Sequence, residues 1–360
     1  MAEKIILGFS GGTDSFVSAL LLKKKYEVVA VTLDLWDFNS SGIINEARSL
    51  AKEIGIEHHV IEAKTFFETK VVKPFVRDYL SAKTPSPCSV CNNNVKFQLL
   101  AGIANKMGIE KIATGHYVSI FKNTVNDDFY IKKGVDSVKD QSYFLWELSQ
   151  DILKRLILPL GGYTKSEVRQ IAIDNGFKKM STKKESMSVC FLKGRGYVDF
   201  INQYLEENPS FKKEVNYKNL SLKGRVFNSN GDIIGEHTGL LNYTIGQKKG
   251  INFFNGELGL YVKKMSSSSN DIFVAIKKDL NVLDFEIIDY NFINIKDASS
   301  SEITCIVRGL GLNPSGYANL QIVDDKHLIV HLSNPAWAMA PGQPVVFYIG
   351  DILIGGGIAN

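Results

Sequence analysis

The first 118 residues alternate short apolar runs with amphipathic stretches, and this alternation constrains the fold more than any other feature. The apolar runs are typical of buried strands, whereas the stretches between them place apolar residues at helical spacing. Strands separated by such helices indicate an α/β fold with a parallel, doubly wound sheet, which binds ligands at the carboxyl ends of its strands. The expected strands are 4–9, 27–36, 58–63 and 111–118, and the expected helices are 14–25, 43–55, 66–80 and 95–107.

The rest of the chain predicts a helical segment followed by two smaller, mainly β domains. Residues 139–209 are mostly helical by pattern, and Thr164 and Glu167 form a T-x-x-E capping box at the start of one helix. Short alternating runs follow, with a hairpin turn at Asn230-Gly231. We therefore expect three domains: 1–210, 211–280 and a C-terminal β-barrel at 281–360.

Charge is distributed unevenly along the 360 residues, although the formal net charge is only +4. Residues 281–360 hold 3 basic and 8 acidic side chains, whereas residues 132–195 hold 13 basic and 7 acidic ones. The second segment predicts a basic surface, which is either a solvated face or a contact for a polyanion. No apolar run approaches the length of a membrane span, and the first residues lack the features of a secretory signal. We expect a cytoplasmic protein that does not enter a membrane.

The stretch GFSGGTDS, residues 8–15, joins the first expected strand to the first expected helix. Backbone N–H groups at a helix N-terminus favour an anion, the glycines permit close approach, and the serines add hydroxyl donors. Asp14 would repel a phosphate unless Mg²⁺ or an amide network intervened. The phosphate-binding lysine of the better-known glycine-rich loops is missing. A plain tight turn is the alternative to an anion site.

Three of the four cysteines lie in segments that suggest chemistry. Cys88 and Cys91 form a C-x-x-C pair before a helix start, where a thiol pKa is expected to be lowered, and basic residues surround Cys190 in the sequence. Cys305, in an alternating run, is interpreted as an ordinary buried strand residue. A redox dithiol and a zinc site with His116 as fourth ligand are the alternatives to nucleophilic thiols.

The complete set of motifs is more specific than any single one. SGGTDS resembles the PP-loop of the adenine nucleotide alpha-hydrolase class, a HUP-like fold whose members cleave ATP between the α- and β-phosphates. The ordered series SGGTDS, TPSPCSVCNNNVKF, ATGHY, KDQSYFLW, LPLGGYTKSEVR, SVCF and GLLNYTIGQKKG resembles the tRNA-specific 2-thiouridylases, the MnmA family. This resemblance implies a tRNA-uridine 2-sulfurtransferase. It also implies ATP and Mg²⁺ as cofactors, and tRNA and a sulfur donor or relay protein as partners.

The resemblance assigns roles to residues of this chain. It implies that Cys91 is the catalytic nucleophile and that Cys190 carries the persulfide sulfur, with Cys88 as a further catalytic candidate. The implied ATP-binding residues are Gly8, Phe9, Ser10, Gly11, Gly12, Thr13, Asp14, Ser15, Leu33 and Gly115. The implied contacts to the tRNA or its target base are Ser86, Pro87, Cys88, Lys139, Asp140, Gln141 and Arg308.

The implied reaction is the replacement of the C2 oxygen of the wobble uridine by sulfur. Uracil O2 is a poor leaving group, so adenylation converts it into AMP, and oriented donors stabilise the charge that develops. The persulfide on Cys190 then attacks C2 directly, or Cys91 releases its sulfur as sulfide. Both routes leave Cys91 and Cys190 joined as a disulfide, which requires the two thiols to meet in some state.

The sequence departs from the usual family pattern near both thiols. Many members have an aspartate three residues before the nucleophile, where this chain has Cys88. Glu185 and Met187 replace the usual residues before Cys190, and the loop after Trp36 is shortened. The third thiol admits a 4Fe-4S cluster as an alternative sulfur carrier. The sequence also admits a PP-loop ligase acting on a small molecule, or a zinc-bearing RNA-binding protein without activity.

Overall fold

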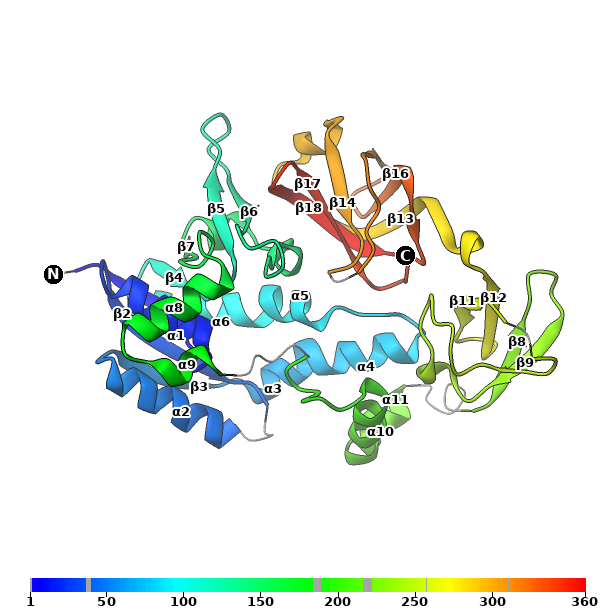
Figure 1. Cartoon of the computed structure of the whole chain (residues 1–360), viewed down its shortest axis with the longest axis horizontal. Helices are drawn as coiled ribbons and strands as arrows, with labels where there is room; N and C mark the ends of the chain where they lie inside the picture. The colour runs from blue at the N-terminus through cyan, green and yellow to red at the C-terminus, as the bar shows by residue number, and fades with distance from the viewer. Residues whose placement is uncertain (1, 37–39, 184–188, 216–221, 257, 310) are drawn as a thin grey trace.

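The N-terminal part of the chain is built on a five-stranded parallel sheet (Figure 1). The computed structural model describes residues 2–36, 40–183, 189–215, 222–256, 258–309 and 311–360. The strand order is β3 (Glu57–Glu62), β2 (Glu27–Asp34), β1 (Lys4–Gly8), β4 (Lys111–Ala113) and β7 (Leu156–Ile157). The parallel sheet predicted from the alternating pattern is confirmed.

Helices cover both faces of this sheet, because alternate strand residues point to opposite sides. Ile5 and Leu7 belong to one core cluster, which they share with α1 (Thr13–Leu22), α2 (Ser40–Glu53) and α8 (Lys165–Asp174). Ile6 belongs to the opposite cluster, which contains α6 (Phe97–Lys106) and residues of the C-terminal sheet. The sheet is therefore doubly wound. The capping box on α8 is also confirmed, because Thr164 and Glu167 cap each other's backbone N–H groups.

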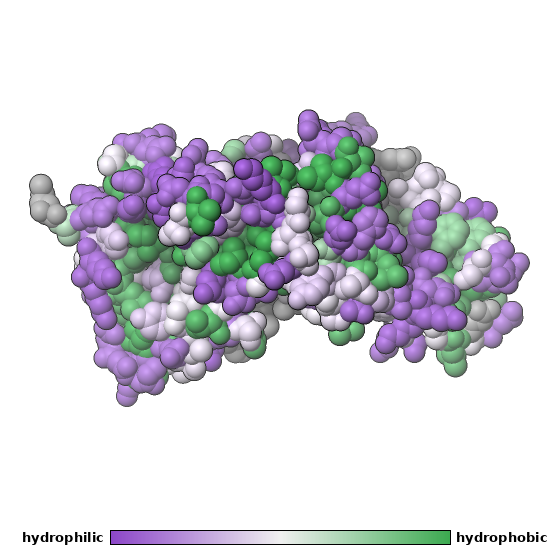
Figure 2. Space-filling view, turned by 90° about the horizontal axis from the view of Figure 1, so that it is seen from above, coloured by the Kyte–Doolittle hydropathy of each residue, from purple (hydrophilic) through white to green (hydrophobic). Residues whose placement is uncertain are grey.

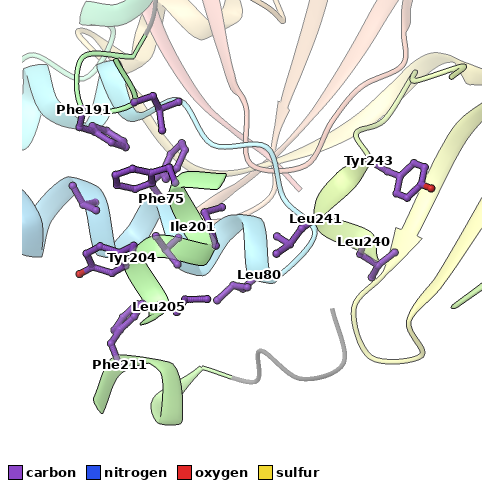
Figure 3. Packing of buried hydrophobic residues seen from close by; sticks show 14 of the residues in the cluster. Phe75, Leu80, Phe191, Ile201, Tyr204, Leu205, Phe211, Leu240, Leu241 and Tyr243 are labelled. Carbon is purple, nitrogen blue, oxygen red and sulfur yellow. The ribbon is translucent and has the colours of Figure 1, made fainter. Parts of the chain in front are cut away.

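A helical layer extends from the sheet toward the central domain and shares one hydrophobic core with it. Figure 3 shows Phe75, Phe191 and Ile201 packed together, with Leu240 and Leu241 farther along the cluster. The helices of this layer are α3 (Lys64–Phe67), a π-helical turn (Glu68–Val72), α4 (Lys73–Leu80), α5 (Pro87–Cys91), a second π-helical turn (Asn92–Lys96), α10 (Tyr197–Glu207) and α11 (Pro209–Glu214). Two further short helices pack on the parallel sheet instead: α7 (Gln150–Leu153) in the cluster of Ile6, and α9 (Lys178–Ser181) in the cluster of Ile5 and Leu7.

The central β domain is one five-stranded sheet. Its order is β10 (Asn252–Phe253), β9 (Ile233–His237), β8 (Gly224–Phe227), β12 (Asp271–Ile276) and β11 (Leu260–Ser266). The predicted hairpin is confirmed, because β8 and β9 pair antiparallel around Gly231, which has φ +89°. The hairpin turn therefore uses the conformational freedom of glycine.

The C-terminal sheet includes a hairpin from the N-terminal part of the chain. Residues 111–118, predicted as one strand, form two: β4 ends at Ala113 and β5 begins at Val118. The hairpin of β5 (Val118–Lys122) and β6 (Phe129–Lys133) pairs with β18 (Ile352–Ala359). The other strands are β13 (Asn281–Phe292), β14 (Ile303–Ile306), β15 (Ala318–Ile322), β16 (His327–Trp337) and β17 (Pro344–Ile349). Since sheets and cores cross the expected boundaries, the division at 210 and 280 stays a prediction.

The surface seen from above mixes hydrophilic residues with smaller hydrophobic patches (Figure 2). Large exposed apolar side chains such as Val125, Val138 and Leu258 are normal for a protein of this size and carry no binding argument singly. Within the described ranges, no helix combines the length and apolar character needed to cross a membrane.

Candidate active site

The glycine turn runs from the end of β1 to the first turn of α1. Gly11 has φ +71°, and a Cβ there would lie 3.3 Å from Ala47 of α2, so conformation and close approach both require glycine. Gly12 is the N-cap of α1 and is extended. The first-turn N–H groups of α1 therefore face the carboxyl edge of the sheet, where they favour an anion.

The two serines of the turn differ in their roles. Ser15 is buried, and its hydroxyl donates to the Gly12 carbonyl at 3.1 Å while accepting from the Ser10 N–H at 3.2 Å. Ser10 is exposed, and its Oγ accepts from the Gly12 N–H at 3.3 Å. Ser15 thus braces the turn, whereas Ser10 faces the surface. Their contact with a ligand stays a prediction.

Asp14 is neutralised from a distant segment. The Lys165 ammonium lies 2.6 Å from Asp14 Oδ1, and the Tyr117 hydroxyl donates to the same oxygen at 2.6 Å. Only 10% of the Lys165 side chain is exposed. The repulsion that the sequence suggested between Asp14 and a phosphate is therefore offset by a lysine that begins α8.

A second lysine also reaches the turn, although the local sequence has none. Lys183 Nζ donates to the Gly11 carbonyl at 2.8 Å and forms an ion pair with Glu46 at 2.7 Å. Thr13 Oγ1 donates to the Met180 carbonyl at 2.6 Å, which ties the same segment to the start of α1. Sequence analysis gave Lys165, Lys183 and Tyr117 no role at the glycine turn, although Lys165 lies in LPLGGYTKSEVR and Tyr117 in ATGHY.

The other two residues assigned to the nucleotide lie at the same edge of the sheet. Gly115 follows β4, and a Cβ at this position would lie 3.0 Å from the backbone of Asp14 and Ser15. Leu33 lies near the carboxyl end of β2, which pairs directly with β1. The geometry therefore groups Gly115 with the glycine turn, but ATP binding by these individual residues stays a prediction.

The C-x-x-C pair lies inside a helix, and not before one as the sequence predicted. Pro87 opens α5, Cys91 closes it, and the chain continues without a break through a π-helical turn into α6. Cys88 is exposed and Cys91 is half-buried. Ser86 is the N-cap of α5, and its hydroxyl lies 3.2 Å from that of Ser89.

The position of Cys190 is fixed by the burial of the next residue, Phe191. The Cys190 side chain is exposed, whereas Phe191 is buried and contacts Phe75 edge-on, with ring centroids 5.1 Å apart (Figure 3). Val189 and Cys91 both pack against this same core. The cluster therefore brings Cys190 and Cys91 to one region. Cys305 lies apart, buried in β14, as its alternating run predicted.

The pKa values of the three thiols differ from the sequence prediction, which is wrong on this point. Burial raises the pKa of the Cys91 thiol to about 11, and the neighbouring Cys190 and Cys88 add to this effect. Desolvation by surrounding protein atoms also raises the pKa of Cys88 and of Cys190, although the side chains of both residues reach the surface. The positive charge of Lys96 opposes the increase at all three thiols, but burial outweighs it.

Sequence analysis gave no role to Lys96, yet it lies among these groups. Its ammonium donates to Asn92 Oδ1 at 2.7 Å and lies 3.5 Å from His116 Nε2. Burial lowers the pKa of His116 well below its usual value, and Lys96 lowers it further. The imidazole is therefore neutral, and we assign its proton to Nδ1, which lies 2.7 Å from Thr114 Oγ1.

The zinc alternative has no geometric support in the described part of the chain. No three His, Cys, Asp or Glu side chains there lie close enough to share a metal ion. His116 directs its nitrogens to Thr114 and Lys96. Glu185 and Met187, the departures before Cys190, lie outside the described residues.

The residues assigned to tRNA contacts divide into two groups. Asp140 accepts from the Gly134 N–H at 3.0 Å and from the Ser142 hydroxyl at 2.6 Å, and Gln141 accepts from the Tyr117 N–H at 3.0 Å. Asp140 and Gln141 therefore order their own segment.

Lys139 and Arg308 carry the positive charges of this set. The Lys139 backbone N–H donates to Asp136 Oδ1 at 3.2 Å. Arg308 donates to the Ala338 carbonyl and stacks over Trp337 at 5.7 Å, while burial lowers the pKa of its guanidinium. Contact of these residues with tRNA stays a prediction.

Family models match almost the whole chain in three consecutive stretches. The tRNA methyl transferase HUP domain matches residues 3–194, the tRNA methyl transferase PRC-barrel domain matches 199–276, and the Aminomethyltransferase beta-barrel domain matches 283–359.

Curated relatives are similar to this chain over nearly its full length. The tRNA-specific 2-thiouridylase MnmA 1 of Bacteroides fragilis (strain YCH46) is 38% identical over 99% of this chain and 97% of its own. The corresponding MnmA proteins of Halothermothrix orenii and Koribacter versatilis are 36% and 34% identical, each over 99% of this chain and 98% of their own. With this identity along the whole chain, a glycine turn at the sheet edge, and Cys91 and the neighbours of Cys190 on one core, the chain belongs to the MnmA family of tRNA-specific 2-thiouridylases.

Proposed function

We propose that this protein uses ATP to activate the C2 oxygen of a wobble uridine in tRNA and then replaces that oxygen with sulfur. The observation that carries the proposal is that one hydrophobic core holds Cys91 and both neighbours of Cys190, Val189 and Phe191, although Cys91 and Cys190 are 99 residues apart in the chain. The identity with 2-thiouridylases along the whole chain supports the same reaction. The products are 2-thiouridine, AMP and pyrophosphate.

The glycine turn binds the phosphates in this proposal. The N-terminus of α1 supplies backbone donors, and Lys165 and Lys183 supply positive charge beside them. Mg²⁺ prefers oxygen ligands, and the carboxylate of Asp14 is the group of the turn that fits this preference. A Mg²⁺ bound with ATP would supply charge neutralisation for the leaving pyrophosphate.

The thiols perform the transfer. Cys190 is exposed, so a donor protein can load it with a persulfide. In one route the outer sulfur of the persulfide attacks C2 of the adenylated uracil, and Cys91 then attacks the Cys190 sulfur and releases the thiolated base. In the other route Cys91 attacks the Cys190 sulfur first, and the sulfide released attacks C2. AMP leaves with the original oxygen, and Cys91 and Cys190 end as a disulfide. An external thiol reductant then restores both thiols.

The tRNA-binding residues in this proposal are Lys139 and Arg308, with Ser86, Pro87 and Cys88 facing the target base. Phosphate contacts of the basic segment position the tRNA body, and the extruded base enters beside α5. Asp140 and Gln141 hold this segment in place through their hydrogen bonds.

The test is mass spectrometry of nucleosides from unmodified tRNA incubated with the protein, ATP, Mg²⁺ and a sulfur donor. We expect 2-thiouridine with the wild-type protein and none with Cys190→Ser or Cys91→Ser. Cys305→Ala is the matched control, because Cys305 is buried in the C-terminal sheet away from the other thiols. Full activity of both Ser variants would overturn the proposal. ATP cleavage to AMP without any thiolated nucleoside would favour a small-molecule substrate.

A further inference from the structure

The positive charge of Lys96 acts on all three thiols, and the sequence analysis assigns Lys96 no role. It ends the π-helical turn that follows Cys91, so its side chain turns back toward α5. The Asn92 carbonyl oxygen accepts from Lys96 Nζ at 2.7 Å. Asn92 is itself buried, and its amide donates to the Phe144 carbonyl at 3.0 Å. The ammonium is therefore held by a fixed partner.

A second contact helps to fix the position of the Lys96 ammonium. His116 Nε2 lies 3.5 Å from Lys96 Nζ, and the His116 ring stacks on Phe97 with centroids 5.8 Å apart. A neutral imidazole beside an ammonium accepts a hydrogen bond and does not neutralise the charge. The positive charge of Lys96 therefore remains available to the sulfur atoms.

The backbone N–H of Lys96, one π-helical turn after Cys91, also acts to lower the pKa of the Cys91 thiol. One residue thus presents a donor and a charge to the same thiol. Negative charge develops on sulfur at several points of the transfer: on the attacking thiolate, on the persulfide and on any released sulfide. A fixed cation stabilises each of these charges without reorganisation.

We propose that Lys96 is a positioning residue of the sulfur site. Asn92 and His116 orient its side chain so that the ammonium stabilises negative charge on Cys91 and Cys190. The catalytic role of Lys96 rests on the proposed function. The test of the inference does not depend on that function, because thiol alkylation requires neither ATP nor tRNA.

The ionisable groups that face the Cys91 sulfur come from several elements. Cys88 lies on α5, Cys190 precedes α10, and Lys96 ends the π-helical turn. His116, which follows β4, contacts Lys96. Lys193 interacts electrostatically with Cys190 and so lies at the edge of the group. Both other thiols raise the pKa of Cys91, whereas Lys96 lowers it.

The experiment measures the rate of iodoacetamide alkylation at Cys91 as a function of pH, with fragment mass spectrometry to distinguish Cys91 from Cys88. It compares the wild-type chain with Lys96→Met, Lys96→Gln and Lys96→Arg. Lys106→Met is the matched control, because Lys106 ends α6 and is exposed. Lys96→Gln keeps a polar group beside Asn92, so it carries the test if Lys96→Met does not fold.

Loss of the charge is expected to lower the Cys91 alkylation rate about tenfold on the rising part of the pH profile and to move its midpoint up by about one unit. Lys96→Arg should stay close to wild type, and Lys106→Met should match it. A midpoint that does not move in a folded Lys96→Gln protein, judged by its thermal melt, would overturn the inference. A moved midpoint in a protein that makes no 2-thiouridine would leave this inference standing and would reject the proposed function.

Discussion

Lys165 and Asp14 form an ion pair of 2.6 Å although 151 residues separate them in the chain. The pair joins the first residue of α8 to the first turn of α1, and the Tyr117 hydroxyl closes it at 2.6 Å. It explains how a turn that contains a carboxylate can receive a phosphate. The phosphate approaches a carboxylate whose charge is already offset.

Lys165→Met should therefore weaken both the fold and the affinity for ATP. An uncompensated, partly buried carboxylate costs about 1–3 kcal/mol of unfolding free energy after allowance for the exposed part of Asp14. It should also raise the KM for ATP about tenfold, because it repels the phosphates. Thermal melts and ATP titrations measure the two effects. Lys178→Met, an exposed charge loss on α9, should change neither.

Gly115→Ala should impair ATP binding without a large loss of secondary structure. The new Cβ would lie 3.0 Å from the backbone of Asp14 and Ser15, so the glycine turn must shift. We expect a KM for ATP raised by about tenfold or more, measured by pyrophosphate release. Gly102→Ala is the matched control, because nothing lies within 4 Å of its new Cβ. The control should be neutral or slightly stabilising, since Gly102 lies inside α6. Equal ATP affinity in both variants would contradict a nucleotide role for Gly115.

The sequence predicted those features that depend on neighbouring residues. The capping box of Thr164 and Glu167 and the hairpin at Gly231 are set by local hydrogen bonds and local backbone freedom, and both are present. The alternating pattern also predicted the parallel sheet, because burial of whole strands leaves a clear signal.

Long-range contacts were not predictable in the same way. Nothing around Lys165 or Lys183 marks either as a neighbour of the glycine turn, because the tertiary fold alone brings them there. The prediction that the thiol pKa values are lowered was wrong for the same reason. The local argument considered a helix start and nearby basic residues, whereas the dominant effect on Cys91 is burial under segments distant in the sequence.

Glu147 predicts a pH dependence of stability. Burial raises the pKa of Glu147 to about 7 from an ordinary value of 4.5, and Asp289 of the C-terminal sheet raises it further. Between these values the folded state retains a proton that the unfolded chain has lost, so stability falls as the pH rises from about 4.5 to 7. The loss should be about 1–3 kcal/mol.

Glu147→Gln should remove this loss, because the amide mimics the protonated acid. Its thermal midpoint should exceed that of the wild type at pH 8 and approach it at pH 4.5, as measured by circular dichroism. Glu53→Gln, at the exposed end of α2, is the control and should show no such difference. A variant less stable than wild type at pH 8 would show that the Glu147 carboxylate is stabilising.

The family resemblance implies an aspartate at the position of Cys88, and the chemistry of Cys88 can be tested by introducing that residue. Burial raises the pKa of the Cys88 thiol, so at neutral pH it is protonated and can donate a proton to the departing oxygen or leaving group. We expect Cys88→Ser to lower kcat for 2-thiouridine formation about 100-fold, the usual contribution of a general acid or base. Cys88→Asp should recover most of this loss, because an aspartate can carry the same proton.

The two variants separate the acid–base role from thiol chemistry. If Cys88→Asp is as slow as Cys88→Ser, the sulfur itself is required, as in a disulfide or cluster. If Cys88→Ser is as fast as wild type, Cys88 has no catalytic role. The measurement is single-turnover formation of 2-thiouridine with preloaded Cys190 persulfide, so loading by the donor protein does not affect the result. The position of Cys88 on α5, one helical turn before Cys91, makes the acid–base role the expected one, since both side chains then face the same base.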